Sequence, residues 1–215
     1  MHPAIRVRDL IFSHGEGHTL SITAFDLPAR ESCAVMGPSG CGKTTFVQLL
    51  AGMLRPHSGT LDVLGTDLSK LSGSETDRFR GQNIGFVFQQ LHLFPALNVR
   101  ENLRLAQRLA RATVDDDYLN QLLERLGVAN LSHRRPDQLS FGQMQRVAVA
   151  RALAHKPSLL IADEPTSALD NQNAAATIDL LTESAAEADA ALLVVTHDER
   201  LRGRLRGEYE LGATG

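Results

Sequence analysis

The sequence has no tryptophan, few aromatic residues and only two cysteines. Aromatic residues make up 5% of the 215 residues, and the cysteines are Cys33 and Cys41. Two cysteines are too few for the disulfide framework that stabilises small secreted proteins, so we expect two free thiols in a reducing compartment. A chain of this length fits one domain and can bury a substantial core.

Long apolar runs and an excess of basic charge are also missing. Runs such as residues 191–195 are far shorter than the ~20 apolar residues of a membrane helix. The first residues lack the apolar stretch of a signal peptide. The net charge is −3, which offers no general attraction to nucleic acid. We therefore expect a soluble chain with no nucleic-acid partner, whose membrane role, if it has one, comes through a partner.

A complete phosphate-binding loop is present near the N-terminus. Residues 37–44 are GPSGCGKT, which matches G-x-x-x-x-G-K-[ST] in full. Its glycines let backbone N–H groups turn toward phosphate oxygens, and the helix that follows adds its dipole. We expect Lys43 to reach the β- and γ-phosphates of a nucleoside triphosphate and Thr44 to bind magnesium. The residues expected to line this site are Gly37, Pro38, Ser39, Gly40, Cys41, Gly42, Lys43, Thr44 and Thr45.

Two adjacent carboxylates end an apolar strand, in the segment LLIADE at residues 159–164. Sheets of α/β proteins place ligands at this end of their strands. We expect Asp163 to hold magnesium, directly or through water, and Glu164 to orient and deprotonate an attacking water. Adjacent residues on a strand point to opposite sides, which allows the two carboxylates different roles. The alternative, a solvated strand end, fits such a pair poorly.

The segment LSFGQ at residues 139–143 opens an apolar-periodic helix. Ser140 and Gly142 provide a hydroxyl and a backbone N–H at a helix start, an arrangement that attracts anions. Serine is also a favoured N-cap, which is the simpler interpretation. One ATP cannot easily be held by both this helix end and Lys43 in a single chain. We therefore expect the two motifs to meet across a head-to-tail dimer.

These motifs, in this order, resemble those of the ATP-binding cassette (ABC) family over essentially the whole chain. The resemblance implies that Gln89 touches magnesium and water, and the F-Q-x-x-x-L-x-P spacing favours it over the adjacent Gln90. It implies that His197 contacts the γ-phosphate and keeps the water and Glu164 in line. The family stacks adenine on an aromatic residue, and His14 stands at that position here.

The resemblance also describes the dimer. It implies that Ser140, Gly142 and Gln143 close over ATP held by the other cassette, and that Asp170, in the D-loop, contacts the opposite subunit. Phe141 stands where the family usually has glycine. The bound species would be ATP and Mg²⁺. The partners would be a second copy and a transmembrane permease subunit, at the cytoplasmic face of the inner membrane.

Within the family, residues 85–103 resemble the lipoprotein-release, macrolide-export and cell-division cassettes, although PTSALD at residues 165–170 is also typical of amino-acid importers. Two other hypotheses remain open. One is a soluble ABC ATPase of DNA repair or translation, and the other is a mechanical transmitter that moves no substrate. A small-molecule kinase would leave LSFGQ unexplained.

The fold class is predicted to be α/β. Uninterrupted apolar strands that alternate with helices indicate a parallel sheet covered on both faces. The resemblance implies a P-loop NTPase core, an N-terminal antiparallel β-subdomain and an inserted helical subdomain, all in one domain spanning residues 1–215. The core would comprise residues 1–89 and 156–215, and the helical subdomain residues 90–155. The expected strands are residues 5–12, 20–27, 32–36, 59–64, 84–88, 159–162 and 191–196, and the expected helices are residues 43–53, 101–111, 115–126, 143–154 and 171–188.

Two further patterns leave their alternatives open. Residues 91–95 are strongly apolar for a loop, and form either part of the helical core or an exposed groove for a partner's helix. Arg100, Arg104 and Arg108 recur every four residues, and mark either a solvated helix face or a contact with lipid headgroups or a partner.

Overall fold

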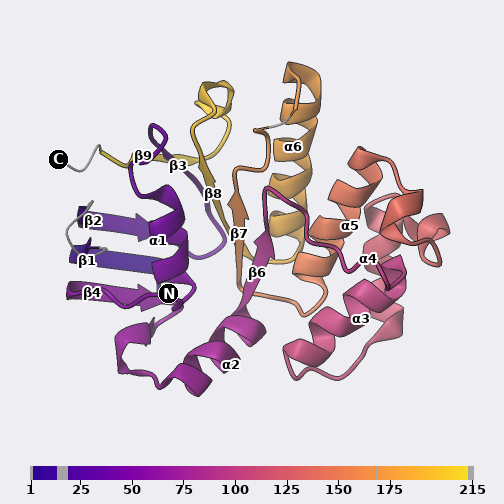
Figure 1. Ribbon diagram of the computed structural model, residues 1–215, viewed down its shortest axis with the longest axis horizontal. Coiled ribbons are helices and arrows are strands. Elements are labelled where there is room, and N and C mark those ends of the chain that lie inside the picture. Colours follow the sequence, from indigo (N-terminus) through magenta and orange to yellow (C-terminus); the bar gives the residue numbers. More distant parts are fainter. Residues whose placement is uncertain (1, 14–18, 168, 213–215) are drawn as a thin grey trace.

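The structure is a computed structural model that describes residues 2–13, 19–167 and 169–212. It contains two sheets and the helices around them (Figure 1). The antiparallel sheet, in the order β2-β1-β4-β5, consists of β1 (Ile5–Ser13), β2 (Thr19–Leu27), β4 (Ser58–Val63) and β5 (Thr66–Asp67). The parallel sheet, in the order β6-β7-β8-β3-β9, consists of β3 (Ser32–Met36), β6 (Ile84–Val87), β7 (Leu159–Asp163), β8 (Ala191–Thr196) and β9 (Gly207–Glu210). The α-helices are α1 (Lys43–Leu50), α2 (Gly73–Asn83), α3 (Val99–Leu109), α4 (Asp116–Arg125), α5 (Phe141–Leu153) and α6 (Asn171–Glu187). The predicted fold class, with antiparallel and parallel parts and helices inserted between β6 and β7, is confirmed.

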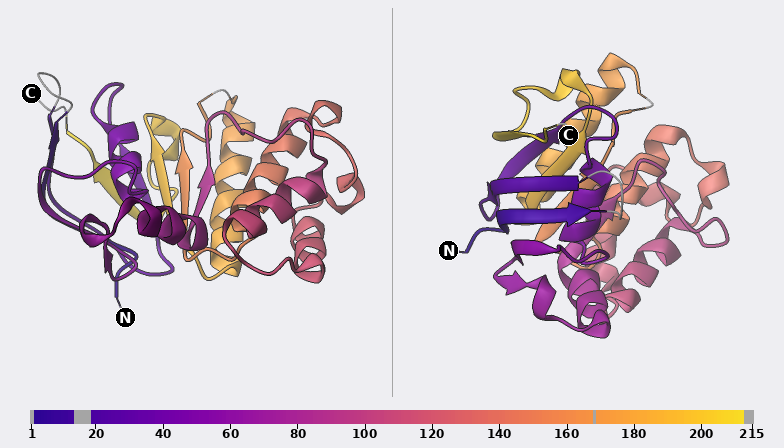
Figure 2. Two further views of the ribbon diagram at one scale, coloured as in Figure 1. Left: turned by 60° about the horizontal axis from the view of Figure 1, so that its bottom comes forward. Right: turned by 60° about the vertical axis from the view of Figure 1, so that its left-hand side comes forward.

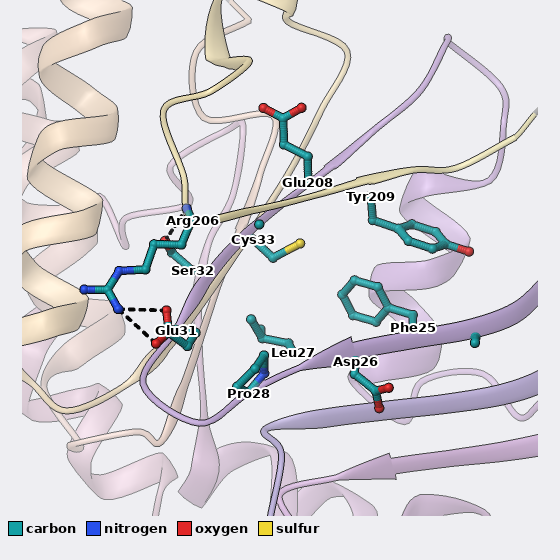
Figure 3. Close-up of a pocket in the computed structure, with 12 residues that line it drawn as sticks. Phe25, Asp26, Leu27, Pro28, Glu31, Ser32, Cys33, Arg206, Glu208 and Tyr209 are labelled. Carbon is teal, nitrogen blue, oxygen red and sulfur yellow. Dashed lines mark hydrogen bonds and ion pairs between the residues drawn. The ribbon is translucent and has the colours of Figure 1, made fainter.

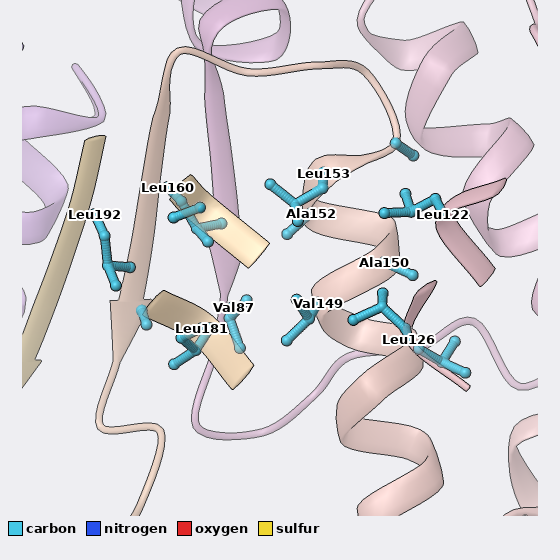
Figure 4. Packing of buried hydrophobic residues seen from close by; sticks show 14 of the residues in the cluster. Val87, Leu122, Leu126, Val149, Ala150, Ala152, Leu153, Leu160, Leu181 and Leu192 are labelled. Atoms are coloured by element: carbon cyan, nitrogen blue, oxygen red, sulfur yellow. The ribbon is translucent and has the colours of Figure 1, made fainter. Parts of the chain in front are cut away.

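The parallel strands are buried on both faces, as their apolar sequences predict. Leu192 and Val194 of β8 belong to a core shared with the helices α3, α4, α5 and α6 (Figure 4). Leu193 and Val195, which point the other way, belong to a second core shared with α1 and the antiparallel sheet. The alternation of side chains along a strand thus connects one sheet to two separate cores. Helix α1 lies between the two sheets (Figure 2).

The arginines of α3 hold this helix to α4. The guanidinium of Arg104 donates from Nε and Nη2 to the two carboxylate oxygens of Asp116, each at 2.7 Å. Arg100 donates to the side chain of Asn120 at 2.6 Å. The interpretation of these two residues as a solvated face is therefore wrong, because they make inter-helix contacts. Arg108 is exposed.

Helix α2 and strands β5 and β9 were not predicted from the sequence. Helix α2 begins with a capping box, in which Ser72 accepts from the backbone N–H of Glu75 and the Glu75 carboxylate accepts from that of Ser72. Its only buried residue is Thr76, so apolar periodicity could not indicate it. Strand β9 is a short edge strand with two glutamates and lies parallel to β3.

Candidate functional site

The phosphate loop connects β3 to α1, as the motif requires. Gly40 and Gly42 have φ of +83° and +98°, a left-handed region that glycine adopts without steric cost. At Gly37 a Cβ atom would come within 2.7 Å of both Cys41 Sγ and the carbonyl oxygen of Leu211. These three glycines therefore give the loop its shape.

Lys43 lies across this loop. Its buried ammonium donates to the carbonyl oxygens of Gly37 at 2.8 Å and Pro38 at 2.9 Å. The same nitrogen is 3.7 Å from Oε1 of Glu164. The lysine thus links the phosphate loop to the carboxylate after β7.

Glu164 is held at the end of the neighbouring strand β8. The Thr196 hydroxyl donates to Glu164 Oε2 at 3.0 Å, and the backbone N–H of His197 donates to the same atom at 3.3 Å. The Nδ1 atom of His197 lies 2.8 Å from Oε1. The prediction that strand alternation orients Glu164 is wrong, because β7 ends at Asp163 and Glu164 has a φ of +48°. A left-handed turn, rather than the pleat of a strand, directs this carboxylate.

Half of the predicted site residues meet in one cleft of about 410 Å³. It is lined by Ser39, Gly40, Gly42, Lys43, Thr44, Thr45, Gln89, Glu164 and His197. Gln89 lines the cleft and donates to the Ser167 hydroxyl at 2.9 Å, whereas Gln90 is not part of the lining. The cleft therefore brings together a phosphate-binding loop, an amide and a carboxylate held by a histidine.

Asp163 has the environment expected of a magnesium ligand. Its Oδ1 is buried and has no hydrogen-bond partner among the described residues. Burial raises the pKa of this carboxyl, nearby Glu164 raises it further, and Lys43 opposes the shift. The described residues contain no cluster of three or more His, Cys, Asp or Glu that could hold a metal. Mg²⁺ needs no such cluster, because it is commonly bound by one or two carboxylates, substrate phosphates and water. The residues present therefore fit this ion.

The segment LSFGQ forms the start of α5. Ser140 is its N-cap and accepts from the backbone N–H of Gln143 at 3.3 Å, while Gln143 Oε1 accepts from the backbone N–H of Ser140 at 2.9 Å. Gly142 has open space beside it. Phe141 is the first helical residue, lacks a positive φ and is 46% exposed. The N-cap interpretation is thus confirmed, and the segment also leaves an aromatic ring and a backbone N–H at the surface.

The phosphate loop and LSFGQ are not brought together within one chain. Helices α1 and α5 lie on opposite sides of β6, β7 and β8 (Figures 1 and 2). Asp170, predicted to contact the opposite subunit, accepts from the backbone N–H of Asn173 at 2.9 Å and caps α6. His14, predicted to stack on adenine, lies outside the described residues.

Three residues outside the predicted motifs, Arg200, Asp198 and Thr196, connect the loop of Asp170 to Glu164. Arg200 donates to the carbonyl oxygen of Leu169 at 3.0 Å and pairs with Asp198 at 2.7 Å. The backbone N–H of Asp198 donates to the hydroxyl of Thr196, which in turn binds Glu164. Thr196 and Asp198 flank His197, a position that could have drawn attention to them. Arg200 offers no comparable signal, because its partner Leu169 is 31 residues distant in sequence.

A second hollow, of about 440 Å³, lies between β2 and β9, away from the phosphate loop (Figure 3). Tyr209 and Phe25 meet there edge to face, with ring centroids 5.1 Å apart. Burial raises the pKa of the Cys33 thiol in its wall to about 11, which disfavours the reactive thiolate. Both cysteines are free and buried, as predicted.

Comparison with known sequences assigns residues 20–167 to the family described as ABC transporter. A lipoprotein-releasing system ATP-binding protein, LolD, from Hydrogenovibrio crunogenus is 42% identical over 189 residues, which covers 87% of this chain and 82% of that protein. LolD from Novosphingobium aromaticivorans is 39% identical over 210 residues, which covers 94% of this chain and 93% of that protein.

Two solved structures are also similar to this chain. CbiO1 from Clostridium perfringens, part of an ABC transporter complex, has a TM-score of 0.82 and 29% identity, covering 92% of this chain and 80% of its own. A dimeric ATP-binding cassette in a post-hydrolysis state with ADP and Pi has a TM-score of 0.72 and 32% identity, covering 90% of this chain and 88% of its own.

Proposed function

Because this chain belongs to the ABC transporter family, as an ATP-hydrolysing subunit, we propose that the cleft between its phosphate loop and Glu164 is the ATPase site. One observation carries this assignment: the carboxylate held by Thr196 and His197 lies 3.7 Å from the buried ammonium of Lys43. A base and a phosphate-binding cation thus face each other in one cleft.

Each group has a role that follows from its position. Lys43 neutralises phosphate charge in a loop whose backbone N–H groups also face the anion. Glu164 orients the attacking water and accepts its proton, while His197 keeps that carboxylate in place. Thr44, Gln89 and the unpartnered Oδ1 of Asp163 would hold Mg²⁺. When bound, this ion would supply charge neutralisation at the phosphates.

We further propose that the active form is a head-to-tail dimer with two ATP. The positions of α1 and α5 on opposite sides of the parallel strands support it, because α1 begins at Lys43 and α5 begins directly after Ser140. Ser140 would contribute its hydroxyl and Gly142 its backbone N–H to the partner's γ-phosphate. Dimeric cassettes among the similar structures support this arrangement.

A groove beside helices α2, α3 and α5 supports the proposal of a membrane partner. No helix among the described residues combines the length and apolarity needed to cross a bilayer. The lobe groove, as we name it, is lined by Met53, Arg80, Gly81, Ile84, Phe86, Phe88, His92, Phe94, Asn102, Leu105, Ala106, Leu109, Ala110, Arg151, Ala152 and His155. Met53, Phe94 and Leu109 are 53%, 49% and 68% exposed. Buried Asn102 shapes its rim, since it accepts from the backbone N–H of Phe94 at 2.8 Å and donates to the Leu97 carbonyl oxygen at 3.1 Å.

We propose that the lobe groove receives a helix of a permease subunit at the cytoplasmic face of the inner membrane. An exposed apolar groove of this kind suits the apolar face of an amphipathic helix. The LolD relatives suggest that the complex is of the lipoprotein-releasing type. In the part of the chain that the structure describes, no comparable feature favours the hypotheses of DNA repair, translation or mechanical transmission.

The ATPase assignment is tested by phosphate release from the purified chain with Mg-ATP. Lys43→Ala is expected to lower the rate by about two orders of magnitude or more, since one positioned charge in a phosphate-transfer site contributes ~10²–10³. Lys70→Ala is the matched control, because Lys70 is exposed and, among the described residues, forms an ion pair only with Asp67, three residues away. Equal rates in the Lys43 variant and the control would refute the assignment.

The membrane assignment is tested by purifying the tagged chain from detergent-solubilised membranes of its own organism. Leu109→Gln is expected to lose a multi-spanning protein that the wild type retains. Ile11→Gln is the control, because Ile11 is also exposed (42%) but lies on β1. Retention of ribosomes or DNA in place of a membrane protein would support the soluble alternative.

A further inference from the structure

The lobe groove is basic as well as apolar. Among its lining residues there are two arginines and two histidines, and there is no aspartate or glutamate. The chain as a whole has a net charge of −3, so this local excess runs against the overall balance. An occupant with a purely apolar face would leave Arg151, which has no carboxylate partner among the described residues, without a counter-charge.

The two arginines differ in the ion pairs and hydrogen bonds that they form within this chain. Arg80 pairs with Asp77 and also donates to the Ala51 carbonyl oxygen at 3.1 Å. Arg151 donates to the carbonyl oxygen of His92 and has no carboxylate within ion-pair distance in the part of the chain that is described. Burial alone lowers the pKa of its guanidinium. Arginine has five N–H donors, so Arg151 retains capacity for a further acceptor.

A second polar group in the groove also lacks a partner. The Nε2 atom of His155 lies 3.3 Å from the carbonyl oxygen of Ile84. Its Nδ1 atom is buried and has no hydrogen-bond partner among the described residues. Arg151 and His155 lie four residues apart in sequence, at the end of α5 and just beyond it, a spacing that places side chains on one face of a helix. Both residues line the lobe groove.

We propose that the helix received by the lobe groove presents a carboxylate to Arg151. This inference rests on the proposed function, and it specifies the chemistry of the permease helix. The apolar face of that helix would cover Met53, Phe94 and Leu109, while its carboxylate accepts from the free donors of the guanidinium. A bidentate arginine–carboxylate pair adds geometric specificity to such a contact. Burying Arg151 under an apolar helix would instead leave an unpaired charge, which is costly.

An anionic lipid headgroup is the other source of negative charge at a membrane. Lipid recognition generally uses clusters of about 4–8 Lys or Arg on one surface. In the lobe groove the only arginine without an acidic partner among the described residues is Arg151, and aromatic and aliphatic side chains surround it. One cation in an apolar setting fits one carboxylate on a helix better than a layer of headgroups.

The first step of the test is to identify the occupant. A photo-crosslinking amino acid is placed at Leu109, in the full chain expressed in its own organism, and the crosslinked peptide is determined by mass spectrometry. The proposal expects a helical loop of a multi-spanning membrane protein that contains Asp or Glu. Failure to crosslink any membrane protein would refute the proposed function itself. A membrane loop without a carboxylate would refute only the present inference.

The second step exchanges the charges. Arg151→Glu is expected to reduce recovery of the complex at least tenfold, and replacing the partner's carboxylate by arginine is expected to restore it. Arg108→Glu makes the same charge change on the exposed part of α3 and should leave recovery unchanged. Absence of rescue would refute the pairing. If circular dichroism shows that Arg151→Glu does not fold, Arg151→Gln and removal of the partner's carboxylate are compared. The double variant should then lose no more than either single one.

A lipid-binding experiment tests the alternative that Arg151 binds an anionic headgroup. Purified wild type and Arg151→Gln are mixed with vesicles of anionic phospholipid and sedimented. The proposal expects equal binding by the two proteins. If Arg151→Gln binds the vesicles markedly less than the wild type, Arg151 serves a headgroup and the proposal is wrong.

Discussion

The Nδ1 atom of His197 lies 2.8 Å from Oε1 of Glu164. The other carboxylate oxygen of Glu164 accepts from the Thr196 hydroxyl and from the backbone N–H of His197. All three contacts come from the end of β8, whereas Glu164 follows β7. The direction of the proposed base is thus set by the neighbouring strand, and the two strands must keep their register for the carboxylate to face Lys43.

Glu164→Gln is expected to bind ATP and to hydrolyse it at least ~100-fold more slowly, because general bases contribute ~10²–10⁴ to such reactions. Glutamine keeps the size of the side chain and an oxygen for Thr196, but it cannot accept the proton. ATP should therefore accumulate in a stable dimer. Phosphate release and size-exclusion chromatography with ATP measure the two effects. Turnover at the wild-type rate would show that Glu164 is not the base.

Asp163→Asn is expected to raise the melting temperature of the protein without nucleotide at neutral pH. Burial raises the pKa of the Asp163 carboxyl above its ordinary value of 3.8. A group whose folded pKa is raised contributes stability below its unfolded pKa and loses it as the pH rises through the folded pKa. Asparagine carries no charge, so the gain should appear at neutral pH and fade below about pH 4, where the aspartate is protonated in both states.

The control for this experiment is Asp189→Asn, because Asp189 is 71% exposed and pairs with Arg30 at the surface. Its melting temperature should change little. If Asp163 holds Mg²⁺ beside ATP, Mg-ATP should raise the melting temperature of Asp163→Asn less than that of the wild type. A lower melting temperature for Asp163→Asn without nucleotide would contradict the assigned cost of burying this carboxylate.

The sequence predicts the parts of this site whose residues lie close together along the chain. It does not predict contacts between segments that are distant in sequence. The phosphate loop, Asp163 and Glu164 are predicted because a phosphate needs glycines, lysine and carboxylates in short, ordered segments. Helix α2 is missed because its capping box is its only signal and almost none of its residues is buried. The contacts of Arg104 and Arg200 join segments distant in sequence, so only the folded chain shows them. The left-handed turn at Glu164 is missed for a different reason, since nothing in its own side chain requires a positive φ.

Arg200→Ala is expected to lower kcat and to change the KM for ATP little. Arg200 links Asp198, which follows His197, to the carbonyl oxygen of Leu169 in the loop of Asp170. Its hydrogen bonds lower the pKa of the Asp198 carboxyl to about 2. Removing the guanidinium loosens that loop and the support of Glu164, while the phosphate loop keeps its contacts.

The readout that separates positioning from simple stability is steady-state kinetics at a temperature well below the melting transition. Arg204→Ala is the control, because among the described residues Arg204 forms an ion pair only with Asp179 of α6. Equal kinetic effects of the two substitutions, or a rise in KM without a fall in kcat, would argue against the link through Asp198.

Phe141→Gly is expected to leave ATP hydrolysis within about twofold of the wild type, a free-energy change of less than ~0.5 kcal/mol. Phe141 begins α5 without a positive φ, and its ring is 46% exposed, so neither the backbone nor the core depends on its identity. A glycine in a helix costs up to ~1 kcal/mol of stability, which would lower the melting temperature slightly.

Ser140→Ala is the comparison, because it removes the hydroxyl proposed to reach the partner's ATP. The rate of ATP hydrolysis by this variant should fall about tenfold or more. An inactive Phe141→Gly that remains folded would mean that the ring takes part in closing the dimer, and that the contacts assigned to Ser140 and Gly142 are incomplete.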